Sequence, residues 1–247
     1  MSGDYQVVQP KAVLEFYRDL VEQRGYPLET AGALAGGRKV WALARTGLVA
    51  GVADDAADKL GAYVLLATSC DKTLATTVTF TSVRVVCQNT LSFAVRDMKK
   101  GNRRSIKVAH SLRFDPAQIK NDLGLMDESW EKFKQQLTPM AGQQLSKGDA
   151  EQFFLSLIQS DKEAKEGKIS DRKHKELMQL MSFYRHAPGQ SLPAAKDTLW
   201  GAVSAVTYYV DHFRLSSGDR LDSAWFGTGA ALKEKAWEKA LEMTQSQ

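Results

Sequence analysis

Apolar residues in the first half of the chain follow the pattern of β-strands. Residues 38–45 (RKVWALAR), 62–69 (AYVLLATS) and 74–86 (LATTVTFTSVRVV) are runs rich in apolar and β-branched side chains, each next to turn residues. Only residues 70–73 separate the second run from the third. This pattern predicts three strands, of which the last two form an antiparallel hairpin.

Elsewhere apolar residues recur every three or four positions, which is the spacing of one helix face. The period changes to this spacing at Cys87, Leu91 and Met98, so we expect a helix there, with Asn89 or Thr90 as its cap. Further helices are predicted over residues 10–25, 115–137, 149–159, 170–186, 194–213 and 229–243, and a short fourth strand over residues 104–110.

The order of these elements predicts an α+β fold in two parts. Residues 1–138 form an α+β domain with a core of helix, three-stranded antiparallel sheet and helix, which is a small sheet with packed helices. Residues 139–247 form a helical region, because the strand pattern disappears after Pro139. The chain contains no internal repeat and no low-complexity tract.

Composition narrows the class of protein. The 247 residues are 43% hydrophobic and 25% charged, as in ordinary soluble proteins, and neither a membrane-spanning run nor a signal peptide is present. We therefore expect a cytoplasmic protein. The 2 cysteines and 4 histidines lack the spacing of a metal site, and no catalytic signature is complete. The sequence predicts no catalytic residue, no metal and no cofactor.

Positive charge is concentrated in one segment, although the net charge of the chain is only +4. Between Arg96 and Arg113 a series of lysines and arginines is accompanied by the single acid Asp97. Such a cationic loop with flexible glycine and asparagine can follow a phosphate backbone, and the release of counterions then supplies affinity. A solvated surface face explains the pattern equally well.

Arg84 interrupts an otherwise apolar strand face. In an extended segment it lies on the same side as Val78, Phe80 and Val86. Two interpretations are open: the guanidinium pairs with Asp97 or another acid as a structural device, or it lies at a groove where the sheet meets a ligand. Structural pairing is the favoured interpretation.

Six stretches of the chain resemble one family. They are RVVCQNTL, SGDYQVVQ, ETAGALAGGRKVWALA, YVLLATSCD, YVDHFR and RLDSAWFGTGAALKEKA, and they extend over nearly the whole sequence. In these motifs the chain resembles the phage/plasmid-like proteins of the uncharacterised family numbered nine hundred and thirty-two. Members usually carry an additional segment before the counterpart of SGDYQVVQ. The resemblance implies a mobile-element protein without an established enzyme activity.

A more distant similarity concerns the order of helix, three antiparallel strands and helix. This order resembles the core of the single-strand annealing proteins of the Red-beta and Rad-fifty-two type, whose rings or helical filaments hold single-stranded DNA in a basic groove. Together with the basic segment, it suggests that the chain binds single-stranded DNA without sequence preference and promotes annealing without ATP. Such a protein would be a homo-oligomer.

Under this hypothesis, particular side chains are expected to contact the DNA. We expect phosphate contacts from Lys99, Lys100, Arg103, Arg104 and Lys107, further contacts from Arg38, Lys39 and Arg84, and base stacking on Trp41. The main alternative is a protein-interaction module that binds a host defence protein through the helical half. An enzyme whose signature is not visible in the sequence is the third possibility.

Overall fold

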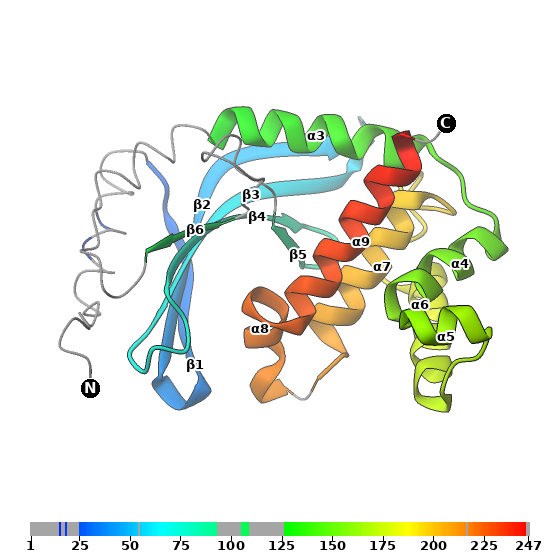
Figure 1. The fold of residues 1–247 in the computed structure, drawn as a ribbon. Helices are drawn as coiled ribbons and strands as arrows, with labels where there is room; N and C mark the ends of the chain where they lie inside the picture. Colours follow the sequence, from blue (N-terminus) through cyan, green and yellow to red (C-terminus); the bar gives the residue numbers. More distant parts are fainter. Residues whose placement is uncertain are drawn as a thin grey trace. The chain divides into compact units, whose positions relative to one another are not determined.

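The computed structural model of the chain describes residues 15, 18, 25–53, 55–92, 105–108, 126–215 and 217–245. The strands are β1 (Leu28–Leu34), β2 (Lys39–Val52), β3 (Asp55–Ser69), β4 (Thr76–Arg84), β5 (Asn89–Ser92) and β6 (Ser105–Val108), with a short 3-10 turn, η1 (Ala35–Gly37), between the first two. The helices are α3 (Met126–Gly142), α4 (Lys147–Ile158), α5 (Asp161–Glu166), α6 (Asp171–His186), α7 (Leu199–His212), α8 (Ser217–Phe226) and α9 (Thr228–Gln245). The α+β fold predicted from the sequence is confirmed (Figure 1).

The strands form one sheet in which each strand pairs with the next along the chain. The order is β1-β2-β3-β4-β5, and β6 pairs with β4 in addition. The β1–β2 and β4–β6 pairs are antiparallel, with Gly32 opposite Trp41 between β1 and β2. A Cβ atom at Gly32 would lie 2.9 Å from the Trp41 ring, so the glycine allows the indole to lie across β1.

The chain divides into two compact units. Unit 1 comprises Met1–Val49, Gly61–Val83 and Leu91–Phe133, and unit 2 comprises Ala50–Leu60, Arg84–Thr90 and Lys134–Gln247. Each unit therefore combines stretches that are distant in the sequence. The predicted division at residue 138 stays a prediction.

Strand β4 is the most buried strand of unit 1. Seven consecutive residues from Thr76 to Ser82 are buried, although most of them carry hydroxyl groups. Hydrogen bonds satisfy these groups: the Thr68 and Thr76 hydroxyls lie 2.9 Å apart, and Ser82 Oγ donates to the carbonyl of Leu91 over 3.1 Å. The strand is thus buried without leaving its polar side chains unpaired.

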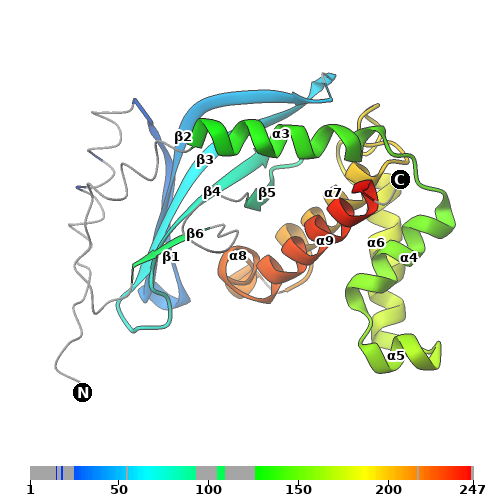
Figure 2. The same cartoon turned by 45° about the horizontal axis from the view of Figure 1, so that its top comes forward.

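Helix α7 forms the centre of unit 2. Twelve of its 14 residues are buried, and α4, α6, α8 and α9 all contact it. Figures 1 and 2 both show α9 running beside it. Small residues allow this close approach, because a Cβ atom at Gly229 of α9 would lie 2.8 Å from Val210 of α7. This burial fits the largely apolar sequence of the helix, and its buried polar residues Ser204, Thr207 and Asp211 are hydrogen-bonded.

Helix starts in unit 2 are set by side-chain caps. Ser146 and Asp149 form a capping box at α4, Ser160 and Glu163 form one at α5, and Thr198 caps α7. Each hydroxyl accepts a backbone N–H that the helix itself leaves unpaired. Thr198 explains why α7 begins later than the predicted residue 194.

The sequence prediction was wrong at the polar triplet after β4. Residues 85–88 form a turn, with Gln88 at φ 55°, and Asn89 begins strand β5. Asn89 and Thr90 therefore do not cap a helix. The predicted helix over residues 10–25 and the positions beyond Ser92 in the helix predicted after Cys87 lie outside the continuously described ranges.

Candidate functional site

Strands β5 and β6 lie on either side of residues 93–104, which hold most cations of the basic segment. Strand β5 ends at Ser92 and β6 begins at Ser105, and both pair with β4. Because β3 forms a hairpin with β4 along its other edge, β5 and β6 share one edge of β4. Ser82 bonds to Leu91 there, and Thr79 pairs with Ser105. The described residues on either side of this stretch, Ser92 and Ser105, thus belong to strands that pair with the same edge of β4.

The main predicted phosphate contacts belong to this segment. Lys99, Lys100, Arg103 and Arg104 lie outside the described residues. The predicted fourth strand is confirmed as β6, in which Lys107 pairs with Thr77 of β4. The backbone of Lys107 is therefore fixed at the sheet edge next to the segment.

The other predicted contacts in unit 1 lie near the start of β2. The Arg38 side chain is 64% exposed; its Nη1 lies 3.7 Å from Asp71, and its Nε donates to the Ala35 carbonyl over 2.9 Å. Lys39 and Trp41 are half-buried. Lys39 and Trp41 lie on β2, and Arg38 directly precedes that strand.

Arg84 is buried inside unit 2. Its Nε and Nη2 atoms each lie 2.6 Å from one carboxylate oxygen of Asp58, so the pair is bidentate. Further acceptors are the Gly189 carbonyl at 3.0 Å and the Ser204 hydroxyl. The guanidinium also lies over the Trp200 ring, 5.4 Å from its centroid. The interpretation as structural pairing is confirmed, with Asp58 as the acid.

This burial bears on the nucleic-acid hypothesis. Arg84 is 1% exposed, and protein acceptors already bind three of its nitrogen atoms. A phosphate could replace them only if the core of unit 2 opened. Arg84 is therefore not among the phosphate contacts that we propose.

A second buried ion pair, between Lys233 and Asp211, lies next to Thr90 of β5. Lys233 Nζ donates to Asp211 Oδ1 at 2.8 Å, to the Thr90 carbonyl at 2.9 Å and to the Thr90 hydroxyl at 3.0 Å. The backbone N–H of Thr90 donates to Asp211 Oδ2 over 2.6 Å. All three ammonium donors are used, which suits an anchoring role better than a reactive one.

Asn89 extends the hydrogen-bond network onto α7. Its side-chain amide donates to the Ser204 carbonyl over 3.1 Å and to the Thr207 hydroxyl over 2.9 Å. The first two residues of β5 are thereby fixed by α7 and, through Lys233, by α9. This is the physical reason that Asn89 and Thr90 form a strand: tertiary partners take the side chains that a helix cap would have used.

The side chains of Arg84, Asn89 and Thr90 and their hydrogen-bond partners form a buried polar cluster. Most of these partners were not predicted from the sequence. Asp58, Trp200, Ser204, Asp211 and Lys233 were not predicted as partners of Arg84 or Thr90. A signal for two of them was present, because YVDHFR contains Asp211 and RLDSAWFGTGAALKEKA contains Lys233, and both motifs carried the family resemblance. Asp58 had no such signal.

The described residues offer little to metal or thiol chemistry. Across the described ranges, no three His, Cys, Asp or Glu side chains gather closely enough to hold a metal ion. Burial raises the pKa of the Cys87 thiol, which disfavours the reactive thiolate. None of the helices that the structure describes has the length and apolar character needed to cross a bilayer.

Comparison with known proteins gives one result. A family model described as "Domain of unknown function (DUF932)" matches residues 1–237 of the chain. Searches of curated proteins and of solved structures gave no match. The family match agrees with the resemblance drawn from the sequence motifs, whereas the similarity to single-strand annealing proteins has no support from these comparisons.

Proposed function

The chain belongs to the DUF932 family, and from its own residues we propose that it binds single-stranded DNA through residues 93–107, which continue from the end of β5 into β6. Binding would be independent of base sequence and would promote pairing of complementary strands without ATP. The family description names no activity, so the proposal depends on charge and on the position of the segment.

The observation that carries the proposal is the distribution of charge. The chain has 33 lysines and arginines against 29 acids, and residues 93–104 hold 5 of these cations and 1 acid. The rest of the chain therefore has 28 of each. The whole positive excess of the protein falls in twelve consecutive residues, which is the pattern of a local anion-binding surface.

Anchoring of the segment supports the same function. Its first end continues from β5, which the buried polar cluster holds through Asn89 and Thr90, and its second end continues into β6 on β4. Closely spaced cations between two fixed ends present a high charge density to a phosphate backbone. Contacts to phosphate carry no sequence information, and bases left free of the protein can pair with a second strand.

The test is a comparison of two quadruple variants. Lys99, Lys100, Arg103 and Arg104 are replaced by alanine in the first. The control replaces Lys162, Lys165, Lys168 and Lys175, which are exposed in and around α5 and α6, and it makes the same change in net charge. Fluorescence anisotropy with a labelled oligothymidine at 0.1 M salt should show binding on the order of 100-fold weaker for the first variant.

The control should bind nearly as tightly as the original protein. Equal affinity of the original protein and the first variant would refute the assignment. A strand-annealing assay with complementary oligonucleotides tests the proposed promotion of pairing. The control should accelerate annealing as the original protein does, and the first variant should not.

Assembly distinguishes this function from the protein-interaction alternative. We expect the protein to be a homo-oligomer that single-stranded DNA reorganises, which size-exclusion chromatography with and without oligonucleotide would detect. A monomer whose elution is indifferent to DNA would favour a module that binds another protein.

A further inference from the structure

Helices α4 and α6 of unit 2 enclose a pocket of about 250 Å³. Leu177, Met178 and Met181 of α6 give it an apolar lining, and Lys147, Glu151 and Arg185 contribute charged groups. All of these residues belong to the helical half, and none of them takes part in the buried polar cluster. The pocket is therefore distinct from the residues on which the proposed function rests.

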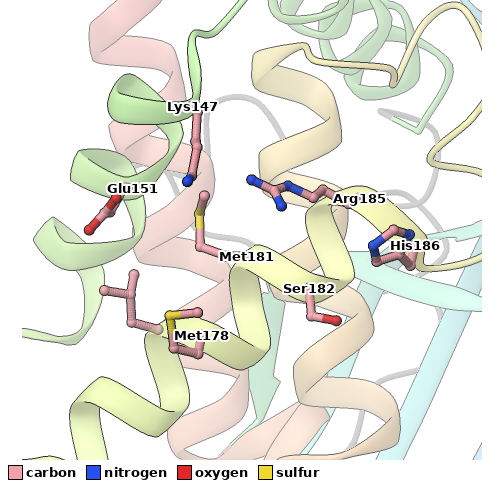
Figure 3. Close-up of a pocket in the computed structure, with 8 residues that line it drawn as sticks. Lys147, Glu151, Met178, Met181, Ser182, Arg185 and His186 are labelled. Atoms are coloured by element: carbon pink, nitrogen blue, oxygen red, sulfur yellow. The ribbon is translucent and has the colours of Figure 1, made fainter.

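The two cations of the pocket face each other. Lys147 extends from the first turn of α4 and Arg185 from the last turn of α6, and their charged ends point toward one another near Met181 (Figure 3). Within the described part of the chain, neither side chain forms an ion pair or a hydrogen bond. Two facing cations repel each other, and an anion placed between them would relieve that repulsion.

The remaining lining defines what accompanies the anion. Leu177 and Met181 are buried, whereas Met178 is 56% exposed. Methionine is flexible and polarizable, and it adapts to apolar partners of different shapes. The volume is below that of typical small-molecule sites, so it suits one or two inserted side chains.

We propose that this pocket binds a peptide segment of a partner protein in which an acidic side chain lies next to an apolar one. The carboxylate accepts hydrogen bonds from Lys147 and Arg185. The apolar side chain packs on Met178 and Met181, and Glu151 can accept a backbone N–H of the peptide. Charge complementarity is thus the basis of recognition.

A nucleic acid fits the same pocket poorly. The Glu151 carboxylate would repel a phosphate backbone, and no Phe, Tyr or Trp lines the pocket to stack on a base. An acidic peptide needs only one carboxylate between the cations and can place an uncharged group near Glu151. The observations therefore favour a protein partner.

The experiment uses the full chain labelled with ¹³C on the methionine methyl groups. The probe is the peptide acetyl-Gly-Leu-Glu-Leu-Glu-Gly-amide, and its control carries Gln in place of both Glu residues. NMR signals of Met178 and Met181, assigned through Met178→Leu and Met181→Leu, should shift saturably with the acidic peptide and not with its control.

Variants then identify the groups responsible. The double variant Lys147→Ala with Arg185→Ala should bind the acidic peptide at least about tenfold more weakly, because two charge-assisted hydrogen bonds are lost. The matched variant Lys165→Ala with Lys175→Ala removes two exposed cations outside the pocket and should bind normally.

Four results would overturn the inference. They are the absence of shifts at both methyl groups, equal shifts with the Gln peptide, unchanged binding by the Lys147 and Arg185 double variant, and shifts at these methyl groups with a twelve-nucleotide oligothymidine. The last result would assign the pocket to phosphate instead of a peptide. Since Lys147 and Arg185 are both exposed, loss of folding is not expected to confuse the comparison, and thermal unfolding by circular dichroism checks this.

Discussion

Arg84 and Asp58 form an ion pair that is removed from water on both sides. The two side chains are 1% and 0% exposed, and Trp200 Nε1 adds a hydrogen bond to Asp58 Oδ2 over 3.2 Å. Taking two charges out of water is costly, and it is offset here by bidentate geometry and additional acceptors. Each partner therefore depends on the other much more strongly than in a surface pair.

The first prediction follows from this dependence. Asp58→Ala leaves a buried guanidinium without its counterion and should lower the free energy of unfolding by about 3–5 kcal/mol. Urea denaturation measures the change. Arg84→Met combined with Asp58→Leu removes both charges, so the double variant should lose less stability than the sum of the single variants. An Asp58→Ala protein as stable as the original would contradict the account.

Glu163 supplies a prediction about pH. Its carboxylate bonds to Lys173 and accepts from the backbone N–H of Ser160 over 2.9 Å, and these contacts lower its pKa from the ordinary 4.5 to about 2. Because the folded pKa is depressed, the cap of α5 is stabilised above pH 4.5 and loses this stabilisation as the pH falls toward 2.

Carboxyl ¹³C NMR tests this directly. Glu163 should titrate with a midpoint near 2, and Lys173→Met should move the midpoint up toward 4.5, since the bond to Lys173 is the largest cause of the shift. A midpoint near 4.5 in the original protein would show that the ion pair does not persist in solution.

At the scale of elements, α7 depends on a glycine near its start. A Cβ atom at Gly201 would lie 2.0 Å from the carbonyl oxygen of Ala195, whereas at Gly148 of α4 the nearest atom is Ser146 Oγ at 3.8 Å. Both glycines are in the first turn of a helix. Only Gly201 is required by its surroundings.

Glycine-to-alanine substitutions should therefore have opposite effects. Gly201→Ala forces the preceding segment away from α7 and should lower the free energy of unfolding by about 2 kcal/mol or more. Gly148→Ala should be neutral or raise it by up to about 1 kcal/mol, because alanine favours the helix. Thermal and urea unfolding compare the two. Equal effects would contradict the close packing of α7.

Periodic apolar patterns in the sequence predicted most of the strands and helices, but not β1, α5 and α8. Strands β4 and β6 and helices α4, α6, α7 and α9 follow apolar periods and were predicted close to their observed positions. Of β2 and β3 only residues 39–45 and 62–69 were predicted, whereas β2 continues to Val52 and β3 begins at Asp55. Strand β1 was missed because its residues LETAGAL are small or polar and almost all exposed. Helices α5 and α8 are short, at 6 and 10 residues.

At the candidate site, contacts between residues far apart in the sequence could not be predicted from local patterns. Arg84 stood out because a cation interrupts an apolar strand, so its pairing could be predicted. Its partners are 26 and 120 positions away, at Asp58 and Ser204. No local period encodes contacts over such separations, and the same contacts converted the expected helix at Asn89 into strand β5.

At the scale of the whole molecule, the residues that carry the positive excess follow directly in the chain after residues that are held in the buried polar cluster. Arg84, Asn89 and Thr90 are fixed inside unit 2, β5 continues from them, and the basic segment follows β5 directly. A core that holds the start of a cationic segment reduces the ordering that binding would otherwise require. We propose that residues 93–107 act as an anchored phosphate-binding segment.

The salt dependence of binding tests this claim most directly. The logarithm of the affinity for oligothymidine is measured against the logarithm of the salt concentration for the original protein, the variant lacking Lys99, Lys100, Arg103 and Arg104, and the matched Lys162, Lys165, Lys168 and Lys175 control. Each phosphate contact to a single strand contributes about 0.7 to the slope, so the first variant should lose about 3 while the control keeps the original slope. The same slope in all three proteins, or no binding by the original protein at low salt, would contradict the account.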